Sequence, residues 1–231
     1  MFFLFPVGVD FRTNRLPVVT FSLMGLCTVI FALGVFLFLS HSTTSEVLSD
    51  PIIDRFGLIP NHVTPLTWFT HMFLHAGFFH LLGNMVYLFL FGAVVEDRIG
   101  RFKFLAFFVV GGLAAAAVHI VFSSPASAHI PMVGASGAIS ACLGAFVVLE
   151  TRTRVEFRYF IWLVIPIVRG EFTLPSYVVI AFWFVSDLIG LALDTMNPSR
   201  QAGVAFAAHV GGMVAGLTLI TGYRTVLRGR E

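Results

Sequence analysis

The sequence predicts an all-α, polytopic membrane protein, a bundle of six transmembrane helices in a single domain that spans residues 1–231. Hydrophobic residues make up 58% of the chain and charged residues only 11%, whereas a soluble domain carries roughly 25% charged residues. The mean hydropathy is +0.93. Apolar runs near the 20-residue length of a membrane helix recur along the chain. Because the bilayer core offers the backbone no water to bond, we expect these runs to be helical.

Six apolar runs are the predicted spans. The first is too long for the core of a signal peptide, so we expect it to be retained as a span. The two cysteines lie inside such runs, which favours buried thiols over a disulfide framework. The six runs are Leu16–Leu39, Phe78–Val95, Phe104–Phe122, Met132–Leu149, Pro175–Leu193 and Gly203–Tyr223.

Two connections differ from plain loops. Residues 40–75 form a long connection, and loops of that length usually carry function or short elements of their own. Residues 155–174 contain a short apolar piece, Phe160–Val168, broken by Pro166. This piece is too short to span a bilayer, so we expect an interfacial or re-entrant segment.

The basic residues predict the topology. Twelve of the 14 fall in one set of connections and two, Arg55 and Arg200, in the other. Because basic residues stay on the cytoplasmic side, tails of about residues 1–15 and 224–231 are expected in the cytoplasm and the 40–75 connection outside. No basic cluster indicates a nucleic-acid partner. The twelve are Arg12, Arg15, Arg98, Arg101, Lys103, Arg152, Arg154, Arg158, Arg169, Arg224, Arg228 and Arg230.

Ser136 and His209 lie inside two of the apolar runs. Polar groups in hydrocarbon are costly and are read as functional by default, and a hydroxyl beside an imidazole suggests an activated nucleophile. Both runs enter from the outside. Helix rise then places Ser136 roughly 7–8 Å and His209 roughly 9 Å below that end, so the two are level.

Other polar residues share this depth. His80 and Asn84 are four apart on one face of the second run. Asp187 lies about six residues before the outer end of the fifth run. It could orient His209 as a third member of a triad, and capping of a helix end is the alternative.

Small residues would let the two helices approach closely enough for a serine to reach a histidine. In isolation, each of these features also fits plain helix packing or structural hydrogen bonding. The recurring residues on one face of each run are Ser136, Ser140 and Gly144, and His209, Gly212 and Gly216.

His71 and His75 have the i, i+4 spacing of two metal ligands. No glutamate follows His71, so structural hydrogen bonding at a loop-to-helix junction is the better interpretation. We expect no metal and no cofactor.

Several motifs in order give a more specific signal. Over about residues 60–220 the chain resembles the rhomboid family of intramembrane serine proteases. The motifs are His75-x4-His80-x3-Asn84, Gly92-Ala93 with Glu96-x3-Gly100, Gly134-Ala135-Ser136-Gly137, and Ala208-His209-Val210-Gly211-Gly212-x3-Gly216.

The resemblance implies a six-span bundle that hydrolyses peptide bonds in or beside transmembrane segments of other proteins. Ser136 would be the nucleophile and His209 the general base. His80, Asn84 and the Ser136 backbone N–H would form the oxyanion hole. The supporting residues would be Gly134, Ala135, Gly137, Gly212, Gly216 and His75.

The hydropathy, the basic residues and the depth of Ser136 and His209 also imply a location. The protein would lie in the cell membrane with the bilayer as a partner and the active site toward the outside.

Two positions depart from the pattern of some rhomboids. Ser140 stands where some members carry a tyrosine that stacks on the histidine, and Trp68 is not followed by arginine. Three alternatives remain: a catalytically silent relative that binds membrane proteins, a small transporter or channel, and a metalloprotease.

Overall fold

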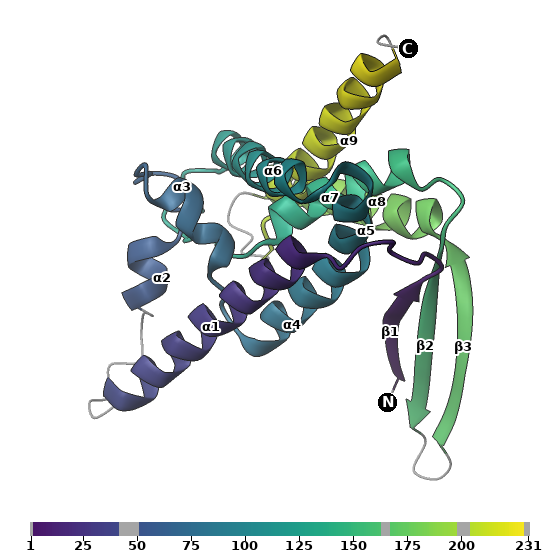
Figure 1. Ribbon diagram of the computed structural model, residues 1–231. Coiled ribbons are helices and arrows are strands. Elements are labelled where there is room, and N and C mark those ends of the chain that lie inside the picture. Colours follow the sequence, from purple (N-terminus) through teal and green to yellow (C-terminus); the bar gives the residue numbers. More distant parts are fainter. Residues whose placement is uncertain (1, 42–50, 163–166, 198–203, 229–231) are drawn as a thin grey trace.

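The protein is a helical bundle with a three-stranded sheet projecting from one side (Figure 1). The computed structural model describes residues 2–41, 51–162, 167–197 and 204–228. The predicted sites Pro166, Arg200, Gly203 and Arg230 lie outside these ranges.

All six predicted apolar runs contain helix, which confirms the helical class. Five helical segments are long and apolar enough to cross a membrane. Four are single helices: α1 (Val18–His41), α6 (Arg101–Phe122), α8 (Ser176–Met196) and α9 (Phe206–Arg228). The fifth, Phe78–Ile99, comprises α4 (Phe78–Tyr87), the π-helical turn η2 (Leu88–Gly92) and α5 (Ala93–Ile99). A sixth full-length span is not found among the described residues.

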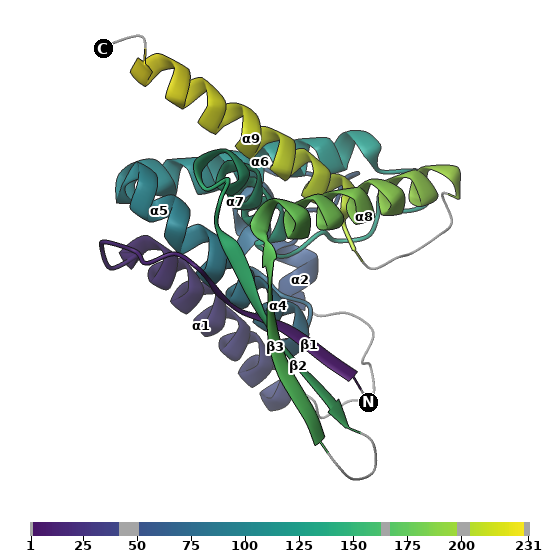
Figure 2. The same ribbon diagram turned by 90° about the vertical axis from the view of Figure 1, so that its right-hand side faces the viewer.

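The remaining apolar run forms the short central helix α7 (Ser136–Leu149). We expected this helix to begin near Met132, which was wrong, because the chain is irregular up to Ala135. Every residue from Gly137 to Phe146 is buried, and Figures 1 and 2 show α7 surrounded by the other helices. Ser136 is therefore the first residue of a buried helix and not a residue one turn inside it.

Small residues press α7 against α9, as the sequence predicted. A methyl group added at Gly212 would overlap the carbonyl oxygen of Gly137, and one at Gly216 would overlap that of Ala141. A methyl group at Gly144 would meet the carbonyl of Met213. With backbone against backbone over two turns, short side chains at the start of α7 can reach α9.

Glu96, near the end of α5, ties the first span to the bundle. Its buried carboxylate accepts hydrogen bonds from the backbone N–H groups of Val19 and Thr20 at 3.0 and 2.8 Å, and from the Thr20 hydroxyl at 2.8 Å. These N–H groups belong to the first turn of α1, where the helix supplies no acceptors. Glu96 thus has a structural role at the end of the second span.

The long 40–75 connection is structured where it is described. It contains α2 (Pro51–Phe56), α3 (Thr67–Thr70) and the 3₁₀ turn η1 (His71–Phe73). Leu58 is fully buried and pairs by two backbone hydrogen bonds with Met132, just before α7. This connection therefore packs on the segment that leads to Ser136.

Where the 155–174 segment is described it consists of strands, whereas we expected an interfacial or re-entrant segment. Strands β2 (Arg154–Trp162) and β3 (Ile167–Pro175) are antiparallel, and β1 (Phe2–Val9), within the predicted N-terminal tail, pairs with β2. Exposed Arg154, Glu156 and Arg158 alternate with buried Val155 and Phe157. This two-residue period is typical of a strand, and the length of an apolar segment does not reveal it.

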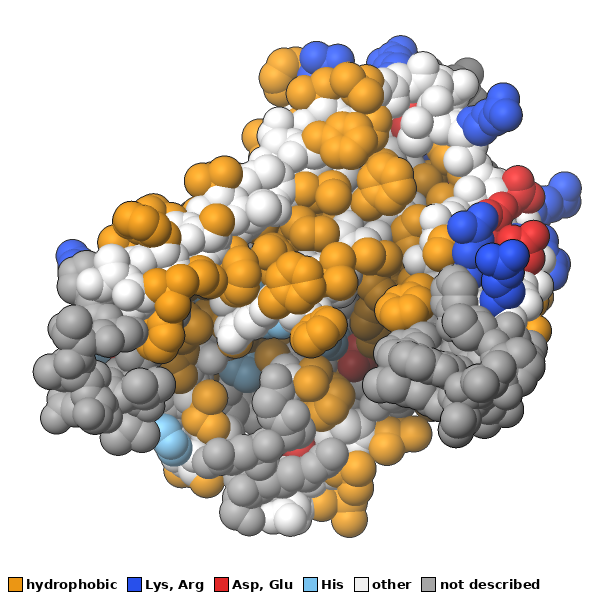
Figure 3. All heavy atoms as spheres, turned by 90° about the horizontal axis from the view of Figure 1, so that it is seen from below, with side chains coloured by type: hydrophobic (Ala, Val, Ile, Leu, Met, Phe, Trp, Pro, Cys, Tyr) orange, Lys and Arg blue, Asp and Glu red, His pale blue; other side chains and the backbone are white. Residues whose placement is uncertain are grey.

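Helix α9 continues through residues 224–228, the first part of the predicted C-terminal tail. Viewed from below, most described side chains on the surface are apolar, and most lysines and arginines gather toward one end (Figure 3). An apolar surface of this extent fits lipid contact.

Candidate active site

Ser136 is held at the N-terminus of α7 by the irregular segment before it. Gly134 has φ +117°, a conformation that L side chains rarely adopt, and its N–H donates to the carbonyl of His71 at 2.9 Å. This turn places Ser136 in the first helical turn. The backbone N–H groups there have no intrahelical acceptor and mark the positive end of the helix dipole.

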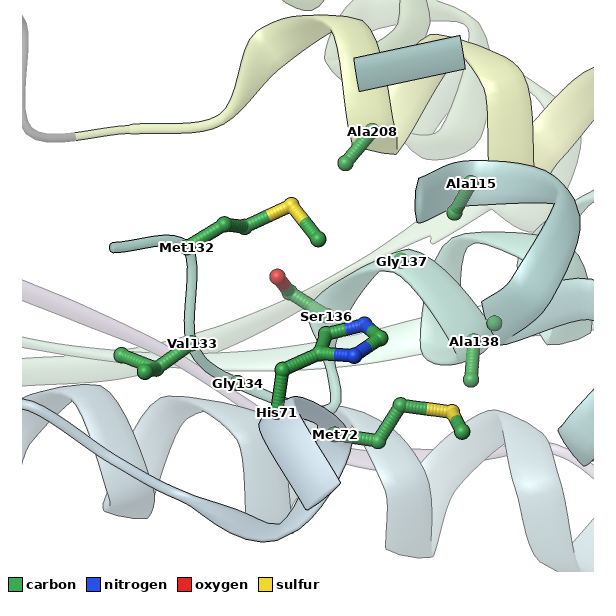
Figure 4. A pocket seen from close by; sticks show the side chains of 11 residues that line it. His71, Met72, Ala115, Met132, Val133, Gly134, Ser136, Gly137, Ala138 and Ala208 are labelled. Carbon is green, nitrogen blue, oxygen red and sulfur yellow. The ribbon is translucent and has the colours of Figure 1, made fainter. Parts of the chain in front are cut away.

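The Ser136 hydroxyl points into a small cavity (Figure 4). The His71 ring lies beside it, and Ala208 of α9 forms the opposite wall. The cavity has a volume of about 10 Å³ for the centre of a water molecule, which is room for roughly one water. The complete lining is His71, Met72, Gly112, Ala115, Met132, Val133, Gly134, Ser136, Gly137, Ala138 and Ala208.

His209 lies in the first turns of α9, beside the start of α7. A methyl group at Gly137 would lie 3.8 Å from both the Cβ and the carbonyl oxygen of Ala208, the residue before His209. The structure thus brings together the two helix ends that carry Ser136 and His209. The His209 ring nitrogen Nδ1 lies 3.3 Å from Oδ1 of Asp187 on α8.

His80 also belongs to this cluster. A methyl group at Gly134 would lie 2.7 Å from Nε2 of His80 and 3.8 Å from Oγ of Ser136. The His80 ring therefore lies against the turn that presents the serine. Asn84, one turn further along α4, is buried, and its Nδ2 donates to the His80 carbonyl at 2.8 Å.

His75 packs behind His80. Their ring centroids are 5.2 Å apart with the planes at 64°, an edge-to-face contact. Burial, reinforced by the charge of nearby His80, lowers the pKa of His75 to about 4. Neutral His75 thus supports one side of the His80 ring.

His71 lies closer to Ser136 than the sequence indicated. Its Nδ1–H donates to the Thr67 carbonyl at 2.8 Å, and its own carbonyl accepts from Gly134. Burial lowers the pKa of His71. The i, i+4 spacing to His75 was its only sequence signal. Structural hydrogen bonding at the loop-to-helix junction is confirmed for His71.

The other supporting positions also have a place at this site. Ala135 is fully buried, and a methyl group at Gly212 would lie 3.3 Å from Cβ of Ser140. Ser140 thus faces α9 one turn after Ser136.

Trp68 packs on a cluster that includes Leu58. Within the described part of the chain, no three His, Cys, Asp or Glu side chains are grouped to hold a metal.

Known proteins similar to this chain identify its family. The rhomboid domain family matches residues 62–225, most of the chain. This protein belongs to the rhomboid family. The match covers every helix from α3 to the last turns of α9 and includes Ser136 and His209. A rhomboid with five span-length helices among its described residues is a multi-pass membrane protein.

Three rhomboid proteases are 27–28% identical to this chain over the residues that align with it. The rhomboid protease GlpG of Haemophilus influenzae is 28% identical over 150 residues, which is 65% of each chain. That of Klebsiella pneumoniae is 28% identical over 164 residues, 71% of this chain and 50% of its own. The rhomboid protease GlpG of Salmonella choleraesuis is 27% identical over 152 residues, which is 66% of this chain and 46% of its own. The matched part thus spans about half to two thirds of these relatives.

Proposed function

We propose that this rhomboid is an intramembrane serine protease in which Ser136 is the nucleophile and His209 the general base. The proposal rests on one observation. The Ser136 hydroxyl points toward the N-terminal end of α9, which bears His209, and the His80 ring lies against the Gly134 turn that precedes Ser136. An alcohol, a base and oxyanion donors at one point are what acyl transfer requires.

The chemistry follows from these positions. Nε2 of neutral His209 takes the proton of the Ser136 hydroxyl as Oγ attacks the scissile carbonyl. The negative charge that develops on the carbonyl oxygen is stabilised by the Ser136 N–H, the His80 ring and the Asn84 amide. Each such donor is worth about 2.7–4 kcal/mol in the transition state. Protonated His209 then gives its proton to the leaving amine, and water hydrolyses the acyl-enzyme by the reverse proton path.

The site is proposed to face the outside, with both termini in the cytoplasm. Support comes from the opposite ends of α7. The far end, at Glu150, pairs with Arg98. Arg224 donates to the Val148 carbonyl there. Ser136 is at the other end, so the basic residues and the site lie at opposite ends of this helix. Basic residues favour the cytoplasmic side.

The proposed substrates are transmembrane segments of other proteins, with weak helicity near the cut. A helix hides its carbonyls in hydrogen bonds, so residues with low helix propensity reduce the cost of exposing one. Lateral access past α8 is consistent with its surface. Phe182 is 77% exposed, whereas Trp183 contacts Tyr87 of α4 with ring centroids 4.0 Å apart.

The test is substitution of each member of the pair. We expect Ser136→Ala and His209→Ala to cleave a model single-span substrate about 10⁴- to 10⁶-fold more slowly than the unaltered protein. A fluorophosphonate should label the unaltered protein and not Ser136→Ala.

Two matched variants serve as controls. Ser22→Ala changes an exposed serine of α1, and His62→Ala changes an exposed histidine of the 40–75 connection. Both variants should retain full activity. Undiminished cleavage by Ser136→Ala or His209→Ala would refute the pair. A protein that folds but neither cleaves nor reacts would instead be the silent relative.

A further inference from the structure

Asp187 is a buried acid in a helix that is otherwise mostly exposed. Along α8 the buried residues are Ser176, Ile180, Asp187 and Gly190, which form one inner face. Asp187 is 3% exposed, while its neighbour Ile189 is 56% exposed. A carboxylate within a membrane helix is costly and persists where a partner compensates it.

The partner is His209. Oδ1 of Asp187 lies 3.3 Å from Nδ1 of His209, and the two side chains are 5% and 11% exposed. Because an ionised carboxylate only accepts hydrogen bonds, Nδ1 must carry the proton. In neutral histidine this leaves the lone pair on Nε2, the nitrogen that the proposed mechanism needs for Ser136.

The packing around this pair fixes its geometry. A methyl group at Gly190, one turn after Asp187, would lie 2.7 Å from ring carbons of Phe206. Phe206 in turn precedes His209 by one turn of α9. This close contact sets α8 against α9 where the carboxylate meets the imidazole.

On α7, the position one turn after the serine is the small Ser140. No bulky group is available at that position to hold the ring from the α7 side.

We propose that Asp187 is a positioning residue for the reaction. It holds His209 in the tautomer with the proton on Nδ1, fixes the ring orientation, and compensates the imidazolium that forms when His209 accepts the Ser136 proton. This inference rests on the proposed function and extends the Ser136–His209 pair to a third side chain. The competing role is purely structural, a buried contact that keeps α8 on the bundle.

The test measures how reactive Ser136 is in the full-length protein in detergent. The readouts are the second-order rate constant for fluorophosphonate labelling, kcat and KM for a single-span substrate, and the thermal midpoint. Asp187→Asn keeps the shape but loses the charge, and Asp187→Ala removes the group. Asp194→Asn, two turns further along α8, is the matched loss of an acid.

We expect Asp187→Asn and Asp187→Ala to lower the labelling rate and kcat about 10- to 1,000-fold, below the roughly 10⁴-fold loss in soluble triads because this contact is long. KM should change little, since Asp187 is not expected to touch substrate. Asp187→Glu should recover part of the lost rate. Asp194→Asn should label at the unaltered rate.

Three results would count against the inference. Labelling of Asp187→Asn at the unaltered rate would overturn it and leave the proposed function standing. A loss explained wholly by a lower thermal midpoint and a smaller folded fraction would assign Asp187 the structural role. Absence of labelling of the unaltered protein, with Ser136→Ala behaving alike, would overturn the proposed function itself and the inference with it.

Discussion

At the scale of single residues, Gly134 determines where Ser136, the proposed nucleophile, lies. Its backbone has φ +117°, and its N–H donates to the carbonyl of His71. A methyl group on its Cα would lie 2.7 Å from Nε2 of His80. Glycine is required twice over, once for the backbone conformation and once for the space. A side chain here would move His80 away from the serine that it is proposed to assist.

Gly134→Ala should therefore lower the activity more than its loss of stability alone would explain. We expect a fall in kcat of about 10²-fold or more, the scale of one lost oxyanion donor, together with about 1–3 kcal/mol of backbone strain. Cleavage of a single-span substrate, normalised to folded protein, measures the first. The thermal midpoint measures the second.

Gly100 is the matched control for this change. It has φ +83°, and a methyl group there would meet no atom within 4 Å. Gly100→Ala should show the strain without the loss of kcat. Equal kcat values for the two variants would contradict the role assigned to Gly134.

At the scale of elements, the packing of α7 against α9 positions the residues of the candidate site. Both helices begin near the cavity, and the glycines that follow bring their backbones into contact. Without a strong hydrophobic drive between helices in lipid, such close packing is a main source of association. The distance between Ser136 and His209 is thus set by residues one and two turns away from them.

Gly216→Ala tests this packing. The added methyl group would overlap the Ala141 carbonyl, which is backbone and cannot rotate away. We expect a loss of about 1–3 kcal/mol, the usual range for overpacking, and a fall in activity as α9 shifts. Thermal unfolding in detergent and substrate cleavage are the measurements.

Gly222→Ala, on the same helix, is the control. A methyl group there meets nothing within 4 Å, so stability should be unchanged or rise by about 0.5–1 kcal/mol from the gain in helix propensity. If Gly216→Ala were as stable and active as Gly222→Ala, the close approach of α7 and α9 would be refuted.

At the scale of the whole molecule, two ends of the bundle differ in chemistry. One end gathers cations around Arg98, Lys103 and Arg224, with Glu96 joining α1 to α5. At the other end lie two buried histidines, His71 and His75, in the last part of the 40–75 connection. We therefore expect low pH to destabilise the end that holds the histidines.

The stability of the protein should fall as the pH falls from about 6.5 to about 4. Burial lowers the pKa of His75 from its ordinary 6.5 to about 4, so in this window the unfolded chain binds a proton that the folded chain does not. The stabilisation is complete above 6.5 and is lost on acidification. His71 shifts in the same direction.

His75→Gln should reduce this slope, as measured by thermal midpoints between pH 7.5 and 4.5. His62→Gln, at an exposed site of the 40–75 connection, should keep the slope of the unaltered protein. Identical slopes for the unaltered protein and His75→Gln would show that His75 is not the group that titrates.

Some of the fold was readable along the chain. Apolar length located the helices at the six runs, and small-residue spacing identified Gly212, Gly216 and Gly144 as contact positions. Length alone predicts a membrane segment at Phe160–Val168, whereas the strands are indicated by the alternation of polar and apolar residues from Arg154 to Arg158. The start of α7 was missed because the apolar run continues through Met132, whereas the backbone pairs there with Leu58.

The sequence by itself determined that this protein is a bundle of membrane helices and predicted a shared depth for Ser136 and His209, because hydropathy and helix rise depend only on residues close in the chain. Tertiary structure alone decided that His80 meets Gly134, that His71 lines the serine cavity and that Asp187 meets His209. Those contacts depend on how each helix is rotated about its axis and on the irregular turn before α7. Both are fixed by packing between segments far apart in sequence.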